Sequence, residues 1–522
     1  MEPRVPVRFE PAAVTAWVCP GTTVAEAARA AGVLIAAPCG SRAVCGACGV
    51  RVAEGELDEA DVSELAGLRR APAGVRLACR ARVTGPVTVR PIVSHAPLEP
   101  GASPGIDVPL VAGVDLGTTS VAALLVEARG GREIARSSIP NAQLAFGADV
   151  LSRISASLAG EGVALRDAAA ASIGDALRAA ARAGGVALTG VERVVIAGNT
   201  AMSALLANAD VEPLSHHPFD APYPYREPPV GTASLVGLRD DCHVELVPPL
   251  AAFVGGDALA ATLAAGLVDA DAPELLVDLG TNAEVVLAAR GKLVAASTAA
   301  GPAFEGVGVS CGGPAVPGSV VSVEVRGEQV LLETIGGEPP RWFSGAGLVS
   351  ALATLRETGH LAADGALLEA GPLLGRFSRD SAGVLGVDMG PRDGGSGERL
   401  TVSQLDVRTV QLAKAAIRVA VDEVLATAGV STGELSSVAV AGAFGGALRA
   451  TDLVALGVLP SHMSDRVRVV GNAALEGAAA LALDPPLVEL LESLRVGVQH
   501  VDLAADAGFG AAFVVATQLA EF

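Results

Sequence analysis

The chain has 522 residues and 51% of them are hydrophobic, so it is long enough for about two to four domains with substantial cores. Its net charge of −20 argues against nucleic acid as a partner, because a surface that binds phosphate backbones needs a basic excess. Charged residues interrupt every long apolar stretch and the N-terminal segment lacks the apolar core of a signal peptide. The sequence therefore predicts a cytoplasmic protein without a membrane span.

Residues 1–92 follow the order of strands and helix that is typical of a β-grasp domain. Two short apolar segments, 4–9 and 13–18, predict a β-hairpin, and a capping box formed by Thr23 and Glu26 then opens an alanine-rich helix. Three further strands are expected after the helix, at 48–53, 75–80 and 86–91. Hairpin, helix and then a cysteine loop is the order of ferredoxins.

Four cysteines in this segment have the spacing of ligands to a ferredoxin-type 2Fe-2S cluster. They form the pattern C-x5-C-x2-C-x30-C and are Cys39, Cys45, Cys48 and Cys79. The tight loop would wrap three thiolates around the cluster while the fourth closes from a strand. The x5 spacing resembles the adrenodoxin-like branch. A structural zinc site is the alternative, but zinc sites favour two C-x2–4-C knuckles and this chain has only one.

A change of composition marks the end of this segment. Residues 93–108 contain three prolines and two glycines, which suits a semi-extended linker better than a packed element. From residue 109 onward, short Val- and Leu-rich strands alternate with alanine-rich helices, the signature of an α/β fold. We therefore expect a multidomain α/β protein with a ferredoxin-type domain over 1–92, a linker over 93–108 and a larger domain over 109–522.

Two acidic turns follow strands in the larger domain, 163 residues apart. In each, a strand ends in an aspartate and a Gly/Thr turn follows, which directs N–H groups and hydroxyls toward phosphate oxygens while the carboxylate holds Mg²⁺ or its waters. The first turn contains Asp115, Gly117, Thr118 and Thr119, and the second contains Asp278, Gly280, Thr281 and Asn282. Two such turns at this separation predict a site for ATP and Mg²⁺ in which both aspartates are catalytic.

Three more segments accompany the turns in the order found in the actin, sugar-kinase and Hsp70 superfamily (ASKHA, a ribonuclease H-like fold). Residues 195–200 resemble its first lobe-connecting segment, and 471–474 resemble the start of its second connecting helix. Residues 439–445 resemble its adenosine loop, with Gly442 and Gly445. The order implies two similar lobes that close on ATP. We expect these lobes at about 109–270 and 271–485, with a C-terminal extension at 486–522.

Other polar residues have more than one interpretation. Asp257 lies about 20 residues before the second turn, where sugar kinases keep a catalytic aspartate, but an aspartate at a helix start is equally an N-cap. The glycine-rich stretch 300–313, which contains Glu305, either reaches over the nucleotide, faces a partner or forms structural turns. A polar patch at 141–153, which ends in Arg153, is expected to cap loop-to-helix junctions, with partner contact as the alternative.

Four further phrases join these patterns, namely AGPAFEG, NAQLAFGADVLSRI, AGAFG and the QLAKAAIR helix at 411–418. Together with the cysteines and the two turns, they resemble the reductive activators of corrinoid proteins over nearly the whole chain. The resemblance implies that the four cysteines bind the cluster, while both turns and Gly442–Gly445 frame the nucleotide. It also implies ATP-dependent return of an inactive cob(II)amide, in a corrinoid protein of a methyltransferase system, to cob(I)amide. A separate reductase is expected to supply the electrons, because no flavin or nicotinamide motif is evident.

Three other functions fit part of these patterns. A small-molecule kinase with a redox-sensing ferredoxin domain predicts phosphoryl transfer to a metabolite, but no sugar-binding signature is present. An ATP-dependent electron activator of radical dehydratases also uses this ATPase fold, but that group lacks a ferredoxin domain. A non-catalytic electron-transfer subunit conflicts with the two intact aspartates. The oligomeric state is open, with a homodimer as one option.

Overall fold

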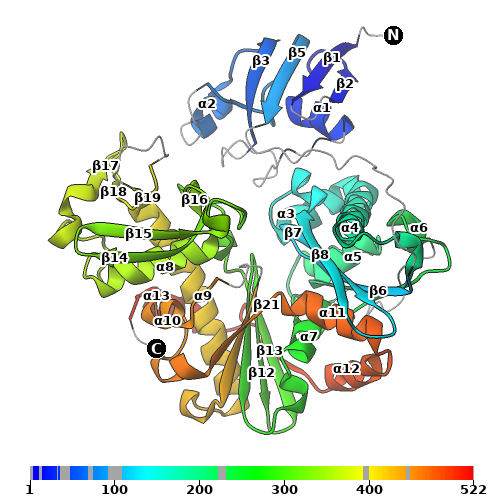
Figure 1. The fold of residues 1–522 in the computed structure, drawn as a ribbon, viewed down its shortest axis with the longest axis vertical. Helices are drawn as coiled ribbons and strands as arrows, with labels where there is room; N and C mark the ends of the chain where they lie inside the picture. Colours follow the sequence, from blue (N-terminus) through cyan, green and yellow to red (C-terminus); the bar gives the residue numbers. More distant parts are fainter. Residues whose placement is uncertain are drawn as a thin grey trace. The chain divides into compact units, whose positions relative to one another are not determined.

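The computed structural model describes residues 4–10, 14–31, 33, 35, 48–68, 74–91, 108–221, 228, 231–391, 399–442 and 447–520 (Figure 1). The chain divides into two compact units: the first comprises Met1–Asp257 and Ala478–Leu487, and the second comprises Ala258–Gly477 and Val488–Phe522. Among the described residues, no helix combines the length and the apolar character that a membrane crossing requires.

A five-stranded sheet in the order β2-β1-β5-β3-β4 forms the N-terminal fold. Its elements are β1 (Val5–Phe9), β2 (Val14–Val18), α1 (Val24–Ala30), β3 (Gly49–Leu57), α2 (Val62–Leu68), β4 (Arg76–Leu77) and β5 (Val83–Pro91). β1 pairs antiparallel with β2 and parallel with β5, which is the β-grasp arrangement. Alternate residues of β1, among them Val7 and Phe9, enter the core. The predicted hairpin and the capping box of Thr23 and Glu26 are confirmed.

The end of this domain differs from the sequence prediction. The strand expected at 75–80 is limited to β4, because the backbone N–H groups of Arg80 and Ala81 both donate to Leu77 O and close a turn. Cys79 therefore lies in a turn and not on a strand. Helix α2 is not predicted by the sequence analysis. Asp61 precedes it and accepts a hydrogen bond from Glu64 N (2.7 Å), as a capping carboxylate does.

The α/β part of the first unit is built on a sheet in the order β10-β9-β6-β7-β8. Its strands are β6 (Leu110–Leu116), β7 (Ser120–Glu127), β8 (Glu133–Pro140), β9 (Val191–Gly198) and β10 (His243–Leu246). β6 pairs antiparallel with β7 and parallel with β9. Six of its seven residues are buried, as expected for a central strand that is covered on both faces.

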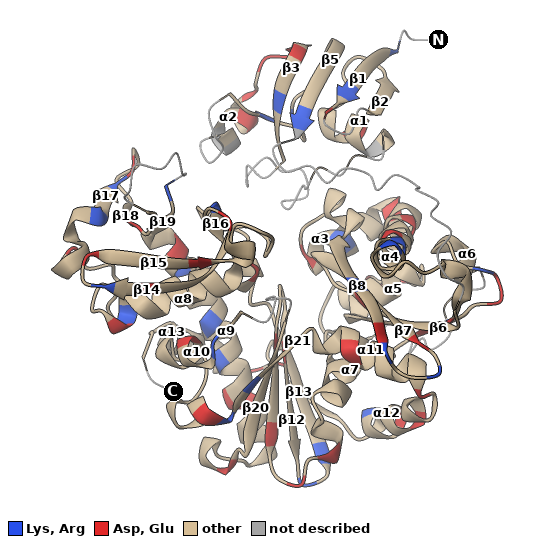
Figure 2. Ribbon diagram, in the orientation of Figure 1, with Lys and Arg blue, Asp and Glu red and all other residues tan. Residues whose placement is uncertain are grey.

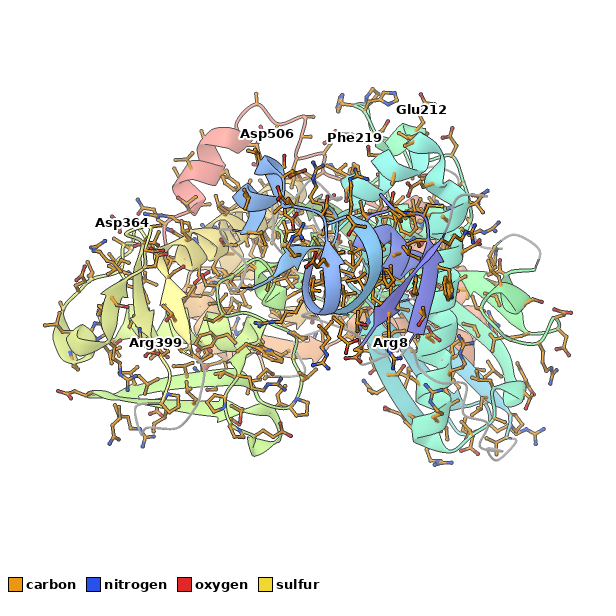
Figure 3. The ribbon with its side chains drawn as sticks, turned by 90° about the horizontal axis from the view of Figure 1, so that it is seen from above. Arg8, Glu212, Phe219, Asp364, Arg399 and Asp506 are labelled. Atoms are coloured by element: carbon orange, nitrogen blue, oxygen red, sulfur yellow. The ribbon has the colours of Figure 1, made fainter. Side chains whose placement is uncertain are left out.

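The helices of this unit are α3 (Val150–Ala156), α4 (Gly162–Gly184), α5 (Thr200–Leu206) and α6 (Thr232–Leu235), with 3-10 turns η1 (Ala142–Ala145), η3 (Leu188–Gly190) and η4 (Glu212–Leu214) and a π-turn η2 (Ser157–Glu161). The next helix, α7 (Gly256–Ala264), begins in this unit and continues in the second. α4 packs on β7 and β8, and its residues Leu165, Ile173 and Leu177 enter the core. Beyond η4, Phe219 (Figure 3) makes an edge-to-face contact with Phe253 at a centroid distance of 5.0 Å.

The second unit repeats this sheet topology. Its main sheet has the order β21-β20-β11-β12-β13-β22 and consists of β11 (Glu274–Leu279), β12 (Ala283–Ala289), β13 (Lys292–Thr298), β20 (Ser437–Ala441), β21 (Val467–Gly471) and β22 (Gln499–His500). β11 pairs antiparallel with β12 and parallel with β20, as β6 does with β7 and β9. Helix α9 (Gln404–Ala428) packs on β12 and β13 as α4 packs on β7 and β8. The chain therefore has the ASKHA-type fold that the repeated acidic turns predicted.

The second half of the chain also has elements beyond its main sheet and α9. Between β13 and α9 lie η6 (Pro302–Glu305), β14 (Ser319–Arg326), β15 (Gln329–Thr334), η7 (Ile335–Gly337), β16 (Trp342–Phe343), α8 (Gly345–Glu357), η8 (Gly371–Arg376), β17 (Phe377–Arg379), β18 (Leu385–Asp388) and β19 (Thr401–Ser403). After α9 come η9 (Thr432–Glu434), α10 (Ala450–Ala455), η10 (Ser461–Arg466), α11 (Ala473–Leu483), α12 (Pro486–Val496) and α13 (Phe509–Ala516). α8 packs on β14, and α13 packs on α9.

Charged residues are sparse in the middle of the two main sheets, whose ribbons are mostly tan in Figure 2. Two aspartates near the ends of the central strands are exceptions. Asp115 is the penultimate residue of β6 and Asp278 is the penultimate residue of β11. The two aspartates therefore occupy corresponding places in the two copies of the sheet, each directly before a Gly/Thr turn.

Candidate cluster and nucleotide sites

Two of the four predicted cluster ligands lie within the described part of the N-terminal domain. Cys48 and Cys79 are buried, and their Sγ atoms lie 3.3 Å apart. A disulfide bond would need about 2.05 Å, so this spacing fits two thiolates gathered around one metal group. Ala78 N donates to Cys48 O (2.9 Å) and so ties the two cysteine segments together. Cys39 and Cys45 lie outside the described residues.

A buried carboxylate supports the segment that leads into Cys79. Glu64 of α2 is only 1% exposed and accepts hydrogen bonds from Leu77 N (2.8 Å) and from Nε and Nη2 of Arg76 (2.8 and 2.9 Å). The hydrogen bonds that Arg76 donates to Glu64 are the main reason that the pKa of Arg76 is raised. Because β4 has only two residues, this network fixes the turn that carries Cys79 more than strand pairing does.

Glu64→Gln is expected to weaken the cluster domain by about 2 kcal/mol, the size of a lost charge-assisted hydrogen bond in a buried site. Urea-induced loss of the visible cluster absorbance measures this change as a shift of the midpoint to lower urea. Glu10→Gln is the matched control in the same domain, because Glu10 also pairs with an arginine, Arg90, which is 63% exposed. Equal midpoints for the two variants would contradict a supporting role for Glu64.

Hydrogen bonds hold the first acidic turn in place. The three residues after Leu116 each accept one with the backbone carbonyl oxygen. Asn141 Nδ2 donates to Gly117 O (2.8 Å), and Asn141 N donates to Thr119 O (2.9 Å). Between them, Arg153 Nη2 donates to Thr118 O. The patch at 141–153 does cap a helix, since Asp149 and Ser152 form a capping box for α3, but its larger role is to support this turn. No local pattern in the sequence indicates that role.

Asn199 joins the first turn to the end of β9. Its Oδ1 accepts from Met202 N (2.9 Å) and caps α5, while its Nδ2 donates to Thr118 Oγ1 (3.0 Å). α5 lies wholly in the first unit, and the chain passes from the first unit to the second within α7. The resemblance of 195–200 to a lobe-connecting segment is therefore wrong in detail: this segment ends in a helix that supports the first turn.

Asp257 lies next to these residues. It is the second residue of α7, so the position directly before the helix is Gly255 and not Asp257. Gly255 packs so closely on Asn199 that a Cβ there would clash with Asn199 Cα, and it would also lie 2.6 Å from Asp257 Oδ1. The structure thus brings Asp257 beside Asn199, which itself contacts Thr118. This placement favours a role at the first turn over a simple N-cap.

The second acidic turn has different neighbours. Asp278 is partly buried and pairs in register with Glu284 and Ala441. Thr281 O accepts from Gly301 N (2.8 Å), and Thr281 Oγ1 donates to Glu305 Oε1 (2.9 Å). Gly280 and Asn282, which flank Thr281, are both partly buried. The stretch 300–313 had three interpretations. The hydrogen bond between Thr281 and Glu305 favours the one in which Glu305 lies at the nucleotide site.

The glycine-rich stretch is anchored to the body of the second unit on both sides of Glu305. A Cβ at Gly345 would clash with Phe304 O, so only glycine allows this close approach. Further along, Asp406, at the start of α9, accepts from Ser310 N (2.7 Å) and Ser310 Oγ (3.0 Å). Glu305 therefore sits on a firmly held segment.

The third predicted nucleotide segment is described in part. Gly442 follows β20, has a positive φ of 142°, and donates from its N to Gly471 O (2.9 Å). Gly445 lies outside the described residues. Asn472 Oδ1 accepts from Leu475 N (3.0 Å) and caps α11, which begins at Ala473 as the sequence predicted.

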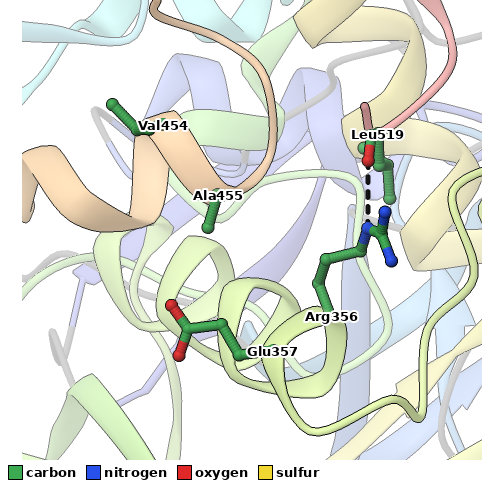
Figure 4. Close-up of a pocket in the computed structure, with 5 residues that line it drawn as sticks. All are labelled: Arg356, Glu357, Val454, Ala455 and Leu519. Carbon is green, nitrogen blue, oxygen red and sulfur yellow. Dashed lines mark hydrogen bonds between the residues drawn. The ribbon is translucent and has the colours of Figure 1, made fainter. Parts of the chain in front are cut away.

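A pocket of about 220 Å³ lies elsewhere in the second unit (Figure 4). It is lined by Arg356, Glu357, Val454, Ala455 and Leu519. Arg356 Nε donates to Leu519 O (3.0 Å), so the C-terminal segment forms one of its walls. No residue predicted for the cluster or the nucleotide lines this pocket.

Buried polar side chains of α9 hold the same C-terminal segment. Lys414 is 1% exposed and donates from Nζ to Ala516 O (2.9 Å) and Gln518 O (2.6 Å). Gln411 Nε2 donates to Thr517 O (2.8 Å). Burial lowers the pKa of Lys414 to about 8. We call this arrangement of Gln411 and Lys414 on residues 516–518 the C-terminal clamp.

Amine acylation is expected to report on the C-terminal clamp, because the chain has only two lysines, Lys292 and Lys414. Gln411→Ala removes one hydrogen bond to residue 517 and should raise the acylation rate of buried Lys414 about five- to thirtyfold, the factor that corresponds to 1–2 kcal/mol. Exposed Lys292 is the internal control and should react at an unchanged rate. Peptide mass spectrometry separates the two sites, and an unchanged Lys414 rate would mean that Gln411 does not restrain the segment.

Comparison with known families accounts for nearly the whole chain. Residues 7–84 match the 2Fe-2S iron-sulfur cluster binding domain, residues 110–270 match the RACo middle region, and residues 272–521 match the C-terminal domain of RACo, the ASKHA domain. The last two matches lie end to end and belong to one family of proteins. Together they span most of the chain.

Named relatives and a solved structure agree with these matches. The chain is 29% identical over 434 residues to the corrinoid activation enzyme RamQ of Eubacterium limosum, covering 78% of this chain and 70% of the relative. It is 26% identical over 355 residues to the Co(II) methylated amine-specific corrinoid protein reductase of Methanosarcina barkeri, covering 62% of each protein. The solved structure of a reductive activator for corrinoid, iron-sulfur protein superposes with a TM-score of 0.72 at 24% identity and 98% coverage of both chains. That superposition shows a shared fold.

Proposed function

The chain belongs to the RACo family of reductive activators for corrinoid proteins, and from this premise we propose that it uses ATP to reduce the inactive cob(II)amide of a corrinoid protein to cob(I)amide. The observation that carries the proposal is the presence, in one chain, of a cysteine pair in a β-grasp domain and of two copies of an Asp-x-Gly-Thr turn at corresponding strand ends. A simple electron carrier needs only the first of these features.

At the redox end, we propose that Cys39, Cys45, Cys48 and Cys79 hold a 2Fe-2S cluster. When bound, such a cluster supplies one electron at a time. Burial of Cys48 and Cys79 excludes water from that side of the site, and the Glu64 network keeps the Cys79 turn in place. A separate reductase is proposed to supply a new electron to this domain after each electron transfer.

At the nucleotide end, we propose that Gly117, Thr118, Thr119, Gly280, Thr281 and Asn282 contact the phosphates of ATP, with Gly442 and Gly445 at the adenosine. The carboxylates of Asp115 and Asp278 are suited to hold Mg²⁺ or its waters, because hard cations prefer oxygen ligands. Asp257 and Glu305 each lie beside one of the turns and are the proposed candidates to orient the attacking water. Hydrolysis then breaks the bond to the terminal phosphate by addition of that water.

The reaction needs both the cluster site and the nucleotide site, because the reduction of cob(II)amide by donors at ferredoxin potential is thermodynamically unfavourable. ATP binding or hydrolysis can help only if it is linked to states that interact differently with the partner's cobalt. We propose that the ATPase domain binds the corrinoid protein and changes its cobalt coordination, so that one electron passes from the reduced cluster to Co(II). The cluster that the four cysteines would hold would supply the one electron that Co(II) accepts, and nucleotide turnover would release the activated partner.

Anaerobic mixing of the reduced protein, a corrinoid protein of a methyltransferase system and MgATP tests this function. The absorbance of cob(I)amide should appear with MgATP, and should stay low when MgADP replaces it or when the oxidised protein is used. Several corrinoid proteins from different methyltransferase systems are needed as substrates. Absence of an ATP-dependent cob(I) band with all of them would overturn the proposal.

A further inference from the structure

Arg153 is a cation enclosed inside the first unit, directly behind the first acidic turn. Its side chain is completely buried, although it extends from α3 toward the end of β6. Nε donates to Gly147 O (2.9 Å), Nη1 donates to Gln143 Oε1 (3.2 Å) and contacts Met202 Sδ (3.0 Å), and Nη2 donates to Thr118 O. Every nitrogen of the guanidinium group therefore has a partner, and all of these partners are uncharged.

No carboxylate forms an ion pair with Arg153 among the residues that the structure describes. Asp149 is the acid that acts on it electrostatically, but Asp149 is engaged in capping α3. Burial lowers the pKa of Arg153 to about 9, which still leaves the group charged at neutral pH. A buried charge without a counterion is costly, so its field is available to an anion that binds nearby.

The geometry of the first turn directs that field to one side. The carbonyl oxygens of Gly117, Thr118 and Thr119 all point to the scaffold formed by Asn141 and Arg153. In a trans peptide, the N–H group of the following residue points in the opposite direction. The N–H groups of Thr118, Thr119 and Ser120 therefore face away from Arg153, and the hydrogen bond to Thr118 O aligns the peptide dipole with the arginine charge.

The second acidic turn has a neighbour of the opposite charge. The carbonyl oxygen of Thr281, the residue that corresponds to Thr118, accepts from Gly301 N instead of an arginine, and the Thr281 hydroxyl donates to Glu305. A cation supports one turn and a carboxylate adjoins the other. Since the two sheets share their topology, this difference comes from the side chains and not from the fold.

We propose that Arg153 is a positioning residue that makes the turn Gly117–Thr119 selective for phosphate, by fixing its N–H groups outward and by supplying behind them a buried positive charge that has no ion-pair partner among the described residues. The proposal rests on the proposed function, because it assumes that the nucleotide's phosphates bind at this turn.

Met202 provides a test that leaves Arg153 in place. Met202→Glu puts a carboxylate at the position of Sδ, 3.0 Å from Arg153 Nη1, and so neutralises the buried charge. Met202→Gln has the same shape without the charge and is the matched control. We expect Met202→Glu to bind MgATP at least about tenfold more weakly than Met202→Gln, the effect of one unit charge near phosphate at an effective dielectric constant of about 20. Isothermal titration calorimetry measures both affinities.

A nucleotide series separates this role from a merely structural one. For Arg153→Gln, the loss of affinity should grow from AMP to ADP to ATP, while adenosine binds as it does to the wild type. Arg153→Lys keeps the charge but loses the fork of hydrogen bonds, so it should recover most of the phosphate-dependent affinity. General loosening of the fold would instead weaken adenosine and ATP by the same factor.

The outcomes are distinguishable. If the wild-type protein binds neither ATP nor ADP, the proposed function fails at the nucleotide site. If the wild type binds ATP but Met202→Glu and Met202→Gln bind it equally, Arg153 is only a structural residue and the inference fails. The Met202 pair decides the question even if Arg153→Gln does not fold, and circular dichroism on all variants identifies that case.

Discussion

Cys79→Ala is expected to lose the 2Fe-2S cluster almost completely and, with it, any ATP-dependent reduction of a corrinoid protein. Cys79 is buried against Cys48, with their Sγ atoms 3.3 Å apart, so Cys79→Ala removes one thiolate from an enclosed site. Even changes beside a metal ligand typically cost 10–100-fold in affinity, so loss of a ligand should lower bound iron by more than about tenfold. Iron content and the visible absorbance of the purified protein measure this loss.

Cys242→Ala is the control for this experiment. Cys242 is also buried, and burial raises the pKa of its thiol to about 11, which keeps it protonated and disfavours metal binding. It belongs to the apolar core that also contains residues of β6 and β9. Its replacement should leave iron content unchanged. ATPase activity should survive in Cys79→Ala, and a cluster that persists there would show that Cys79 is not a ligand.

Asp278→Asn and Asp115→Asn should each lower the ATPase rate about 10²- to 10³-fold, because a metal or water that loses its carboxylate loses several kcal/mol of transition-state stabilisation. The amide has the same shape, so the sheets should fold unchanged. Phosphate release under saturating MgATP measures the rate. Asp241→Asn is the control, because Asp241 is an exposed carboxylate paired with Arg239 at the surface.

These two variants also test whether the cluster site and the nucleotide site can be impaired independently. Cluster absorbance should remain at the wild-type level in Asp115→Asn and Asp278→Asn, and ATP-dependent formation of cob(I)amide should disappear. If formation of cob(I)amide persisted at the wild-type rate without ATP turnover, the coupling between hydrolysis and reduction would be wrong. If only one variant lost activity, the two turns would have unequal roles in catalysis.

The sequence revealed the repeated parts of the fold well, for a physical reason. The strand before Asp115 and the strand before Asp278 are continuous apolar runs because both faces are covered, and each ends at a Gly/Thr turn that only a few folds use. The β-grasp domain was equally clear, since the capping box of Thr23 and Glu26 is a local signal. Apolar runs, tight turns and capping boxes depend on residues that are close together in the sequence, so the sequence reveals them.

The contacts that shape the sites depend on residues far apart in the chain, and the sequence did not show them. Arg153 reaches Thr118 across 35 positions and Glu305 reaches Thr281 across 24. From the sequence, Arg153 was one member of a capping patch and Glu305 was a single charge in a glycine-rich stretch. The sequence places Cys79 on the strand expected at 75–80, but two backbone hydrogen bonds to Leu77 O turn the chain there.

The two main sheets protect their outer strands in different ways, and this bears on how the protein avoids aggregation. β8 borders its sheet, and Glu133 and Arg136 near its start together with Pro140 at its end hinder pairing with another chain. β13 is apolar along most of its length and is instead covered by β22, a strand of only two residues from the C-terminal region. A truncation that removes Gln499–His500 would expose an apolar edge that invites self-association, so expression of shortened forms has to retain that short strand.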